Sequence, residues 1–167
     1  MRRSGTFSAL ALLLLGGACV PRYGFSGGGL PSHIRTMAIQ PFDNETPTPE
    51  LQRELLDAMH RELQSRLGVR DAPEARSDAV VRGVIRTYDA DVPVAYSSNP
   101  AQAVTARRRL RISLDVQIVD LTNNRTIWEK KSLSAEGDYA ERDEVGGRRD
   151  ALKRIVNDIV EGAQSQW

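Results

Sequence analysis

The chain has 167 residues, and its 23 lysines and arginines nearly balance its 22 aspartates and glutamates, for a formal net charge of +1. This length suits one domain, and 40% hydrophobic with 27% charged residues is typical of a globular protein. The near-zero charge argues against a nucleic-acid binder, which carries a basic excess. A single cysteine excludes a disulfide within the chain and a thiolate metal cluster, and two histidines leave little for a histidine-based metal site. We therefore expect no cofactor and no metal.

The N-terminus, residues 1–18, predicts a secretory signal peptide. Arg2 and Arg3 form a positive start, an apolar stretch runs to Leu15, and small residues precede Cys19. The apolar stretch is too short to span a bilayer, which takes about 20 residues.

Cys19 lies where the small residues end, and its surroundings resemble a bacterial lipobox, in which the cysteine is acylated after cleavage. Gly16 departs from the leucine usual at that position, although Leu15 is adjacent. An ordinary signal peptide with a chance cysteine is the alternative. Two or more acyl chains anchor a protein stably. Val20 replaces the aspartate that often follows the cysteine in inner-membrane lipoproteins, so the resemblance implies the outer membrane, facing the periplasm.

The first part of the mature chain contains a tether, a strand and a helix. Residues 19–33 hold the lipidated cysteine and a glycine-rich flexible tether, which leaves 34–167 as the folded domain. Residues 35–42 predict a strand, and 43–47 a turn. Thr48 is the expected N-cap of an amphipathic helix over 49–67 that Gly68 ends. Its apolar residues recur every four positions: Leu51, Leu55, Met59, Leu63 and Leu67.

Three more strands and a helix follow. Residues 79–88 form a strand with Ala79, Val81, Gly83, Ile85 and Thr87 on one face and Arg82, Arg86 and Tyr88 on the other. Residues 89–103 form a long loop. The next strand has the clearest alternation, with buried positions expected at Leu110, Ile112, Leu114, Val116 and Ile118. A turn at 122–125 leads to a strand over 126–136. A second helix runs from about Glu141, and Gly146-Gly147 marks its weak start or a kink.

The order β-α-β-β-β-α predicts an α+β two-layer sandwich. We expect a four-stranded, mainly antiparallel sheet with both helices on one face. The other face of the sheet is then open to solvent or to a partner.

An ordered set of segments resembles the LptE family of lipopolysaccharide-assembly lipoproteins. It covers nearly the whole mature chain: Cys19 followed by Tyr23-Gly24-Phe25-Ser26-Gly27, Leu30 to Ile39, Pro41 to Thr46, the long helix, Val81 to Ile85, the arginine-rich strand, Ile127-Trp128-Glu129 and a last helix ending at Trp167.

The resemblance implies a function without catalysis. In that family the lipoprotein plugs a large outer-membrane β-barrel, LptD, and also binds lipopolysaccharide, which the pair delivers to the outer leaflet. The implied location is the outer membrane, lipid-anchored, facing the periplasm and within the barrel lumen. The same strand and helix segments also resemble other envelope lipoproteins, including CsgG-like secretion components and activators of cell-wall synthases.

The candidate contact residues form a basic run. Arg107, Arg109 and Arg111 share one strand face, and guanidinium groups bind phosphate bidentately. Such a face would suit the phosphates of lipopolysaccharide, and Lys130 and Lys131 on the next strand could extend it. Two alternatives stay open: the charges protect an exposed strand from edge pairing, or they meet acidic residues of the barrel.

Two aromatic residues receive different predictions, and no catalytic motif is present. Tyr96, in the long loop, is a candidate partner contact, whereas Trp128 is expected to complete the core. The sequence contains no nucleophile elbow, phosphate-binding loop or histidine ligand pair. We therefore predict that the protein is not an enzyme.

Overall fold

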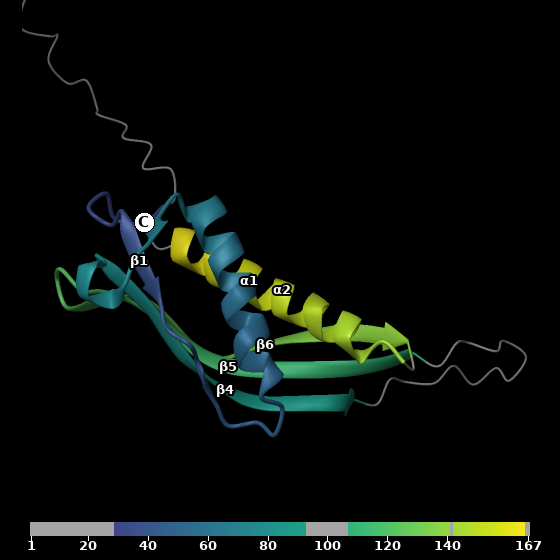
Figure 1. The fold of residues 1–167 in the computed structure, drawn as a ribbon. Coiled ribbons are helices and arrows are strands. Elements are labelled where there is room, and N and C mark those ends of the chain that lie inside the picture. Colours follow the sequence, from purple (N-terminus) through teal and green to yellow (C-terminus); the bar gives the residue numbers. More distant parts are fainter. Residues whose placement is uncertain (1–28, 93–106, 141, 166–167) are drawn as a thin grey trace, which may run out of the picture.

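The computed structural model describes residues 29–92, 107–140 and 142–165, with only the backbone of Arg107. Two helices lie across one face of a long, curved sheet (Figure 1). In chain order the elements are β1 (Thr36–Ile39), β2 (Asp43–Asn44), α1 (Glu50–Leu67), β3 (Arg70–Asp71), the 3-10 helix η1 (Glu74–Arg76), β4 (Ala79–Val92), β5 (Arg107–Asp120), β6 (Arg125–Ala140) and α2 (Glu144–Gln164).

The sheet has the strand order β3-β1-β4-β5-β6, and β2 also pairs with β4. Strands β4, β5 and β6 form an antiparallel meander, whereas the pairs β1–β3, β1–β4 and β2–β4 are parallel. The predicted α+β sandwich with both helices on one face is confirmed. The sheet is mixed and has six strands rather than four, because β2 and β3 are two-residue strands too short to produce an alternating pattern.

Helix α1 follows the predicted periodicity. Leu51, Leu55, Met59 and Leu63 are fully buried, and Gly68 ends the helix in the left-handed conformation at φ 66°. The predicted cap at Thr48 is wrong, because the N-cap position is Pro49 and no side chain caps the helix.

Strand β4 departs from simple alternation. Its pairing with β5 shifts register between Ile85 and Thr87, and a bulge moves the residues that follow it to the opposite face. Tyr88 was predicted to share a face with Arg82, but it packs against the core and Thr87 is exposed. The prediction fails at these two residues because the alternation of apolar and polar residues in the sequence does not reveal the bulge.

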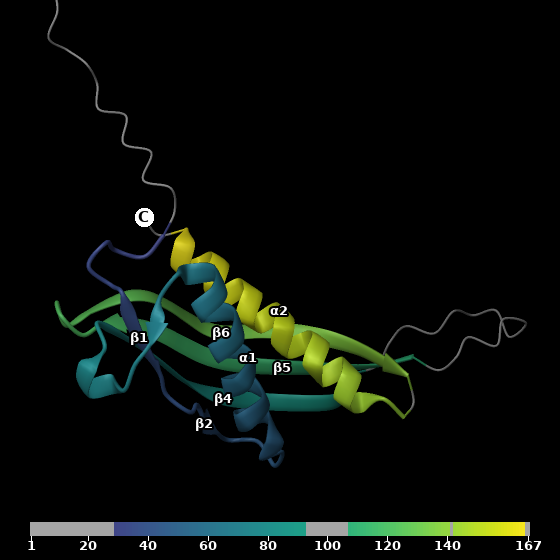
Figure 2. The same ribbon diagram turned by 45° about the horizontal axis from the view of Figure 1, so that its top comes forward.

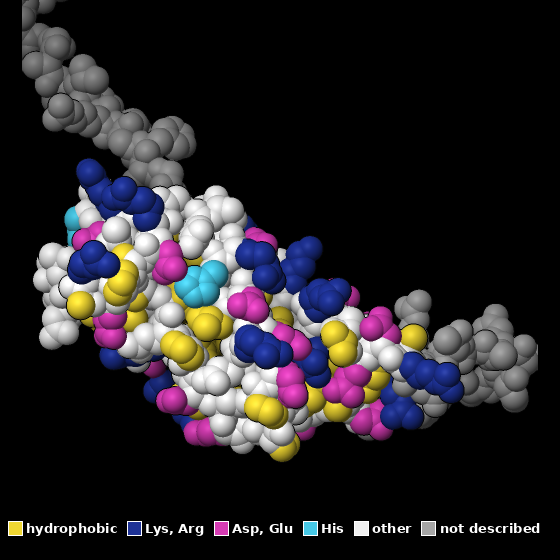
Figure 3. Space-filling view, in the orientation of Figure 1, with side chains coloured by type: hydrophobic (Ala, Val, Ile, Leu, Met, Phe, Trp, Pro, Cys, Tyr) yellow, Lys and Arg dark blue, Asp and Glu magenta, His cyan; other side chains and the backbone are white. Residues whose placement is uncertain are grey.

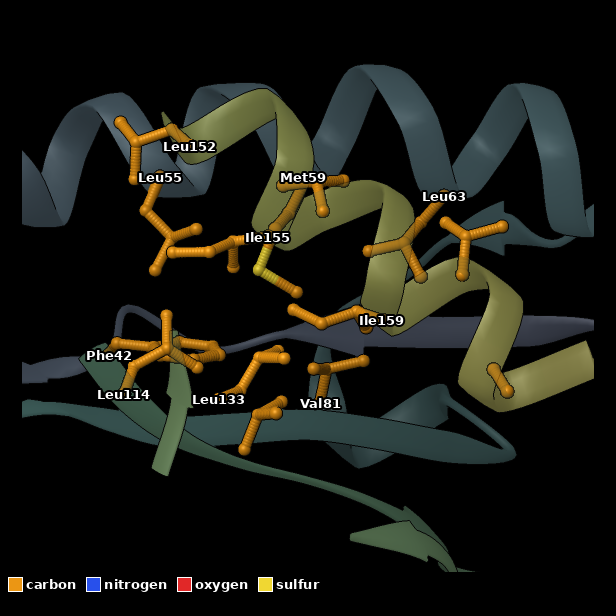
Figure 4. Packing of buried hydrophobic residues seen from close by; sticks show 14 of the residues in the cluster. Phe42, Leu55, Met59, Leu63, Val81, Leu114, Leu133, Leu152, Ile155 and Ile159 are labelled. Atoms are coloured by element: carbon orange, nitrogen blue, oxygen red, sulfur yellow. The ribbon is translucent and has the colours of Figure 1, made fainter. Parts of the chain in front are cut away.

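The core fills the space between the helices and the sheet. Figure 4 shows Leu55 and Met59 of α1 and Ile155 of α2 pointing toward Phe42 and Leu114 of the sheet layer. All five side chains are at most 2% exposed. Trp128 is partly buried and packs against this core, as predicted.

The two helices run in the same direction over the sheet, inclined to each other (Figure 2). Glu54 contacts Arg148 near the start of both helices, and Arg66 contacts Asn157 further along. Helix α2 begins at Glu144, where the Asp143 carboxylate accepts a hydrogen bond from the amide of Gly146 at 3.1 Å.

Helix α2 approaches β6 closely where two glycines meet. A Cβ atom added to Gly137 would lie 1.9 Å from the carbonyl oxygen of Gly147, and one added to Gly147 would lie 2.9 Å from Cβ of Tyr139. Gly137 therefore lets the backbone of β6 approach that of α2, and Gly147, one of the two glycines predicted to weaken the helix start, leaves room for the side chain of Tyr139.

The sheet face opposite the helices is largely exposed. Ala38, Val80 and Val119 form a small buried cluster at one end of it. Nearby, Gln40 donates a hydrogen bond to Glu74 of η1 at 2.6 Å. Beyond this end, charged side chains of both signs cover the face, and these include Arg109 and Arg111 of the predicted contact residues.

Candidate functional site

The predicted contact residues fall partly outside the described structure. Cys19 and Tyr96 lie outside the described residues, and so does the side chain of Arg107. Arg109, Arg111, Lys130 and Lys131 are described. Arg109 and Arg111 point to the sheet face that the helices leave open, on either side of buried Leu110.

The two arginines lie in a ladder of ion pairs with β6. Arg109 Nε lies 2.7 Å from Asp138 Oδ1, and Arg109 Nη1 lies 3.2 Å from Glu136 Oε2. Arg111 Nη2 donates to Glu136 Oε1 at 2.5 Å. These four residues, which we call the β5–β6 ladder, carry two positive and two negative charges.

The pairing affects the ionisation of the ladder. The Arg111 hydrogen bond holds the pKa of Glu136 below its usual value, and the Asp138 hydrogen bond raises the pKa of Arg109. Glu136 and Arg109 therefore stay charged through neutral pH. Arg109 and Arg111 do not create a purely basic surface, because each of these two cations already faces a carboxylate.

Lys130 and Lys131 lie away from the ladder. Lys130 is opposite Val116 in the sheet, five residues along β5 from Arg111. At about 3.4 Å per residue this places it roughly 17 Å away. Lys131 lies 3.7 Å from Glu129. The structure thus brings together Arg109 and Arg111 and does not join the two lysines to them.

A second ion-pair cluster occupies the same sheet face. Arg86 Nη1 lies 2.6 Å from Glu45 Oε1, and its Nη2 lies 2.9 Å from Asp115 Oδ2. The other oxygen of Asp115 accepts the backbone N–H of Ser132 at 2.8 Å. These hydrogen bonds, led by that of Ser132, lower the pKa of Asp115. Sequence reasoning missed this cluster, because its members come from three separate segments.

A third cluster is partly buried between the helices and β4. Arg148 donates two hydrogen bonds to Glu54, from Nε at 2.8 Å and from Nη2 at 2.9 Å. Its side chain is only 11% exposed and lies 3.6 Å from Glu144, which accepts a hydrogen bond from the hydroxyl of Tyr88. Burial, together with this bond, raises the pKa of Tyr88 to about 12. No motif marks this network in the sequence.

His33, predicted to end the tether, is attached to the domain. Its Nε2 lies 2.8 Å from Oδ2 of Asp120, which is fully buried. Asp120 also accepts hydrogen bonds from the backbone N–H and the side-chain amide of Asn123. Burial opposes ionisation of Asp120, but the hydrogen bonds from Asn123 and His33 outweigh it and lower the pKa to about 2.

Within residues 29–92, 107–140 and 142–165, no three histidine, cysteine, aspartate or glutamate side chains are grouped to hold a metal ion. In the same part of the chain, no helix has the length and apolar character required to cross a membrane.

Comparison with protein families identifies the domain. The model of the LptE family, described as lipopolysaccharide-assembly, matches residues 34–165. The chain belongs to the LptE family. The match spans every buried core residue of the described chain, from Ile34 to Ala163, so this protein is an envelope lipoprotein of lipopolysaccharide assembly.

Solved structures with the same fold share little sequence with this LptE-family chain. A protein of Xanthomonas campestris is 10% identical with a TM-score of 0.53, covering 83% of this chain and 91% of its own. A hypothetical protein of Chlamydia trachomatis is 12% identical with a TM-score of 0.52, covering 78% and 98%. The PelC dodecamer of Paraburkholderia phytofirmans is 15% identical with a TM-score of 0.51, covering 81% and 93%. No curated protein matches the chain.

Proposed function

We propose that this protein is anchored in the outer membrane by acyl chains on Cys19 and plugs an LptD-like β-barrel. It assists assembly of the barrel and helps to deliver lipopolysaccharide to the outer leaflet, without catalysing a reaction. The observation that carries the proposal is the family match over residues 34–165, which includes both helices and every strand of the described sheet.

The charge distribution on the domain supports a plug role. Lysines, arginines, aspartates and glutamates alternate over the surface of the helices (Figure 3), and ion pairs cover the opposite sheet face. The interior of a large outer-membrane barrel is polar. A domain with mixed charge on both faces can sit inside such a lumen without placing an apolar patch against polar side chains or water.

The β5–β6 ladder is the proposed contact for lipopolysaccharide or for the barrel wall. Arg109 and Arg111 are 35% and 47% exposed, so each guanidinium can exchange a carboxylate for an arriving phosphate. Arg107, Lys130, Lys131 and Tyr96 remain proposed contacts of the same kind. This arrangement makes lipid capture an exchange of ion partners rather than the filling of an empty basic site.

The test is affinity purification of the tagged protein from detergent-solubilised outer membranes. We expect a stoichiometric large β-barrel to co-elute with the wild-type protein. The control is Cys19→Ser, which removes the acylated sulfur but leaves the domain unchanged. This variant should no longer be found in the outer-membrane fraction, while its folded domain keeps the melting temperature of the wild-type protein.

The alternative is another envelope lipoprotein with a related β-α-β fold, such as a CsgG-like secretion component or a cell-wall synthase activator. The same fold occurs in the dodecameric PelC structure, so the fold alone does not distinguish the two functions. Elution as a homo-oligomeric ring, or with a cell-wall synthase in place of a barrel, would contradict the plug role and support the alternative.

A further inference from the structure

Three arginines surround the point where the N-terminal segment joins the domain. The amide of Arg70 donates to the carbonyl of Arg35 at 2.9 Å. Thr36 is the register partner of Arg70, and its hydroxyl lies 3.5 Å from the carbonyl oxygen of Arg76. We call Arg35, Arg70 and Arg76 the arginine collar. Figure 3 shows Lys and Arg side chains gathered at this end, beside the grey N-terminal segment.

The collar differs from the arginines of the sheet faces. Arg86, Arg109 and Arg111 each pair with a carboxylate. By contrast, the exposed side chains of Arg35, Arg70 and Arg76 have no ion-pair partner within the described residues. These three guanidinium groups therefore keep their hydrogen-bonding capacity for something outside the domain.

The acidic residues at the same end are bonded to other groups. Asp78 accepts the backbone N–H groups of Arg35 and Thr36, each at 2.9 Å, and the hydroxyl of Thr36. Asp71 faces His60, and Glu74 accepts a hydrogen bond from Gln40. The fold thus occupies the nearby carboxylates and leaves the arginines unpaired.

The position of the collar points to its partner. His33 is attached to buried Asp120, so the chain enters the domain at this end. Gly29, the first described residue, is ten positions after Cys19, and ten residues span at most about 35 Å. A lipid on Cys19 therefore holds the collar end, rather than the far end of the long strands, close to the membrane.

We propose that the arginine collar binds the phosphate headgroups of the membrane that holds the acyl chains. Guanidinium groups form bidentate hydrogen bonds with phosphate. The contact holds the collar end of the domain against the headgroups that surround the lipid anchor. This inference rests on the proposed lipid anchor at Cys19 for the location of the surface, but its test does not need the anchor.

The experiment measures vesicle binding by the chain from residue 19 onward carrying Cys19→Ser. Every buried hydrophobic side chain of the described chain lies at or after Ile34, so this protein keeps the whole core. It is sedimented with vesicles of phosphatidylethanolamine containing phosphatidylglycerol. We expect binding that weakens as salt is added. Arg35→Glu, Arg70→Glu and Arg76→Glu together should weaken it about a hundredfold, at roughly fivefold for each arginine near an anionic surface.

The matched control reverses three other exposed arginines, with Arg53→Glu, Arg142→Glu and Arg149→Glu. It changes the net charge by the same amount but leaves the collar intact, so its binding should stay close to that of the parent. Circular dichroism verifies that each variant is folded. If the collar variant with three glutamates unfolds, the same three arginines are replaced by glutamine and the vesicle binding is measured on that variant. Equal losses in the collar and control variants would overturn the proposal, and so would binding only to vesicles that contain lipopolysaccharide. Co-purification of the barrel is measured separately, so the plug role can fail or hold independently.

Discussion

Arg148 on α2 forms a two-pronged ion pair with Glu54 on α1, with nitrogen–oxygen distances of 2.8 and 2.9 Å. The two helices run in the same direction and belong to distant parts of the chain, so no local interaction fixes their spacing. A guanidinium that is only 11% exposed must keep its partners, because an unpaired charge at such a site is costly. The pair therefore adds a specific polar contact to the apolar packing that holds α1 and α2 against each other.

Removal of this guanidinium should destabilise the domain. We expect Arg148→Ala to lower the free energy of unfolding by about 2 kcal/mol, because Glu54 and Glu144 then lose their shared cation in a partly buried site. Urea denaturation measures the change. Arg149→Ala is the control, since that neighbouring side chain is exposed and should change stability by at most about 0.5 kcal/mol. A similar loss in both variants would show that the pair with Glu54 contributes nothing specific.

The close contact between Gly137 of β6 and Gly147 of α2 leaves no room for a side chain at position 137. In Gly137→Ala the new methyl carbon would meet the backbone carbonyl of Gly147 at 1.9 Å, and backbone cannot rotate away as a side chain can. We expect a loss of about 3 kcal/mol and a lower melting temperature. Gly68→Ala gives the comparison: nothing lies near that site, but its positive φ should cost about 1 kcal/mol. Equal effects would mean that α2 moves away from β6 at little cost.

The sequence predicted the parts of this fold that depend on local periodicity. The recurrence of Leu51, Leu55 and Met59 located α1, and alternation located the buried face of β5. The short parallel strands were missed. Only pairing with β1 or β4 makes β2 and β3 strands, and such pairing depends on contacts between distant segments.

The register of the β5–β6 hairpin explains why the ladder could not be predicted. If β5 and β6 paired without interruption from Asp120 and Arg125 at the turn, Arg111 would lie opposite Ser134. Two register shifts, one after Leu114 and one after Ile118, instead place it opposite Glu136. The first shift occurs where Ser132 has a φ of 52° and donates its N–H to Asp115. The sequence therefore identified the arginines but not the carboxylates that neutralise them.

The ladder leads to a prediction about lipopolysaccharide binding. Arg109→Glu with Arg111→Glu would gather four carboxylates on neighbouring strands, so we expect binding of lipopolysaccharide to weaken at least about tenfold. The free energy of unfolding should change by less than about 1 kcal/mol, because these ion pairs are exposed. Binding is measured by titration of the purified protein with lipopolysaccharide, and stability by urea denaturation.

A charge swap provides the control for the ladder. Adding Glu136→Arg and Asp138→Arg to the double variant restores both the net charge and the ion pairs, with the arginines moved to β6. If exposed guanidinium groups on this face capture phosphate, the swap should recover much of the lost affinity. Unchanged binding in the double variant would assign Arg109 and Arg111 to strand protection or to the barrel wall.

Asp120 should make the stability of the domain depend on pH in the acidic range. The pKa of Asp120 is about 2 in the folded protein and about 3.9 in an unfolded chain. Because the folded value is the lower one, the stabilisation is fully present above pH 4 and is lost as the pH falls from about 4 to about 2. The difference between the two pKa values corresponds to about 2.5 kcal/mol.

The measurement compares the wild-type protein with Asp120→Asn by urea denaturation from pH 7 down to pH 2. The difference isolates this carboxylate from Asp78, Asp115 and Glu136, whose pKa values are also lowered in the folded protein. We expect the wild-type protein to be more stable at pH 7 and the gap to shrink steadily below pH 4. A gap that stays constant down to pH 2 would show that His33 and Asn123 do not stabilise the ionised form, and that the attachment of the N-terminal segment does not depend on this charge.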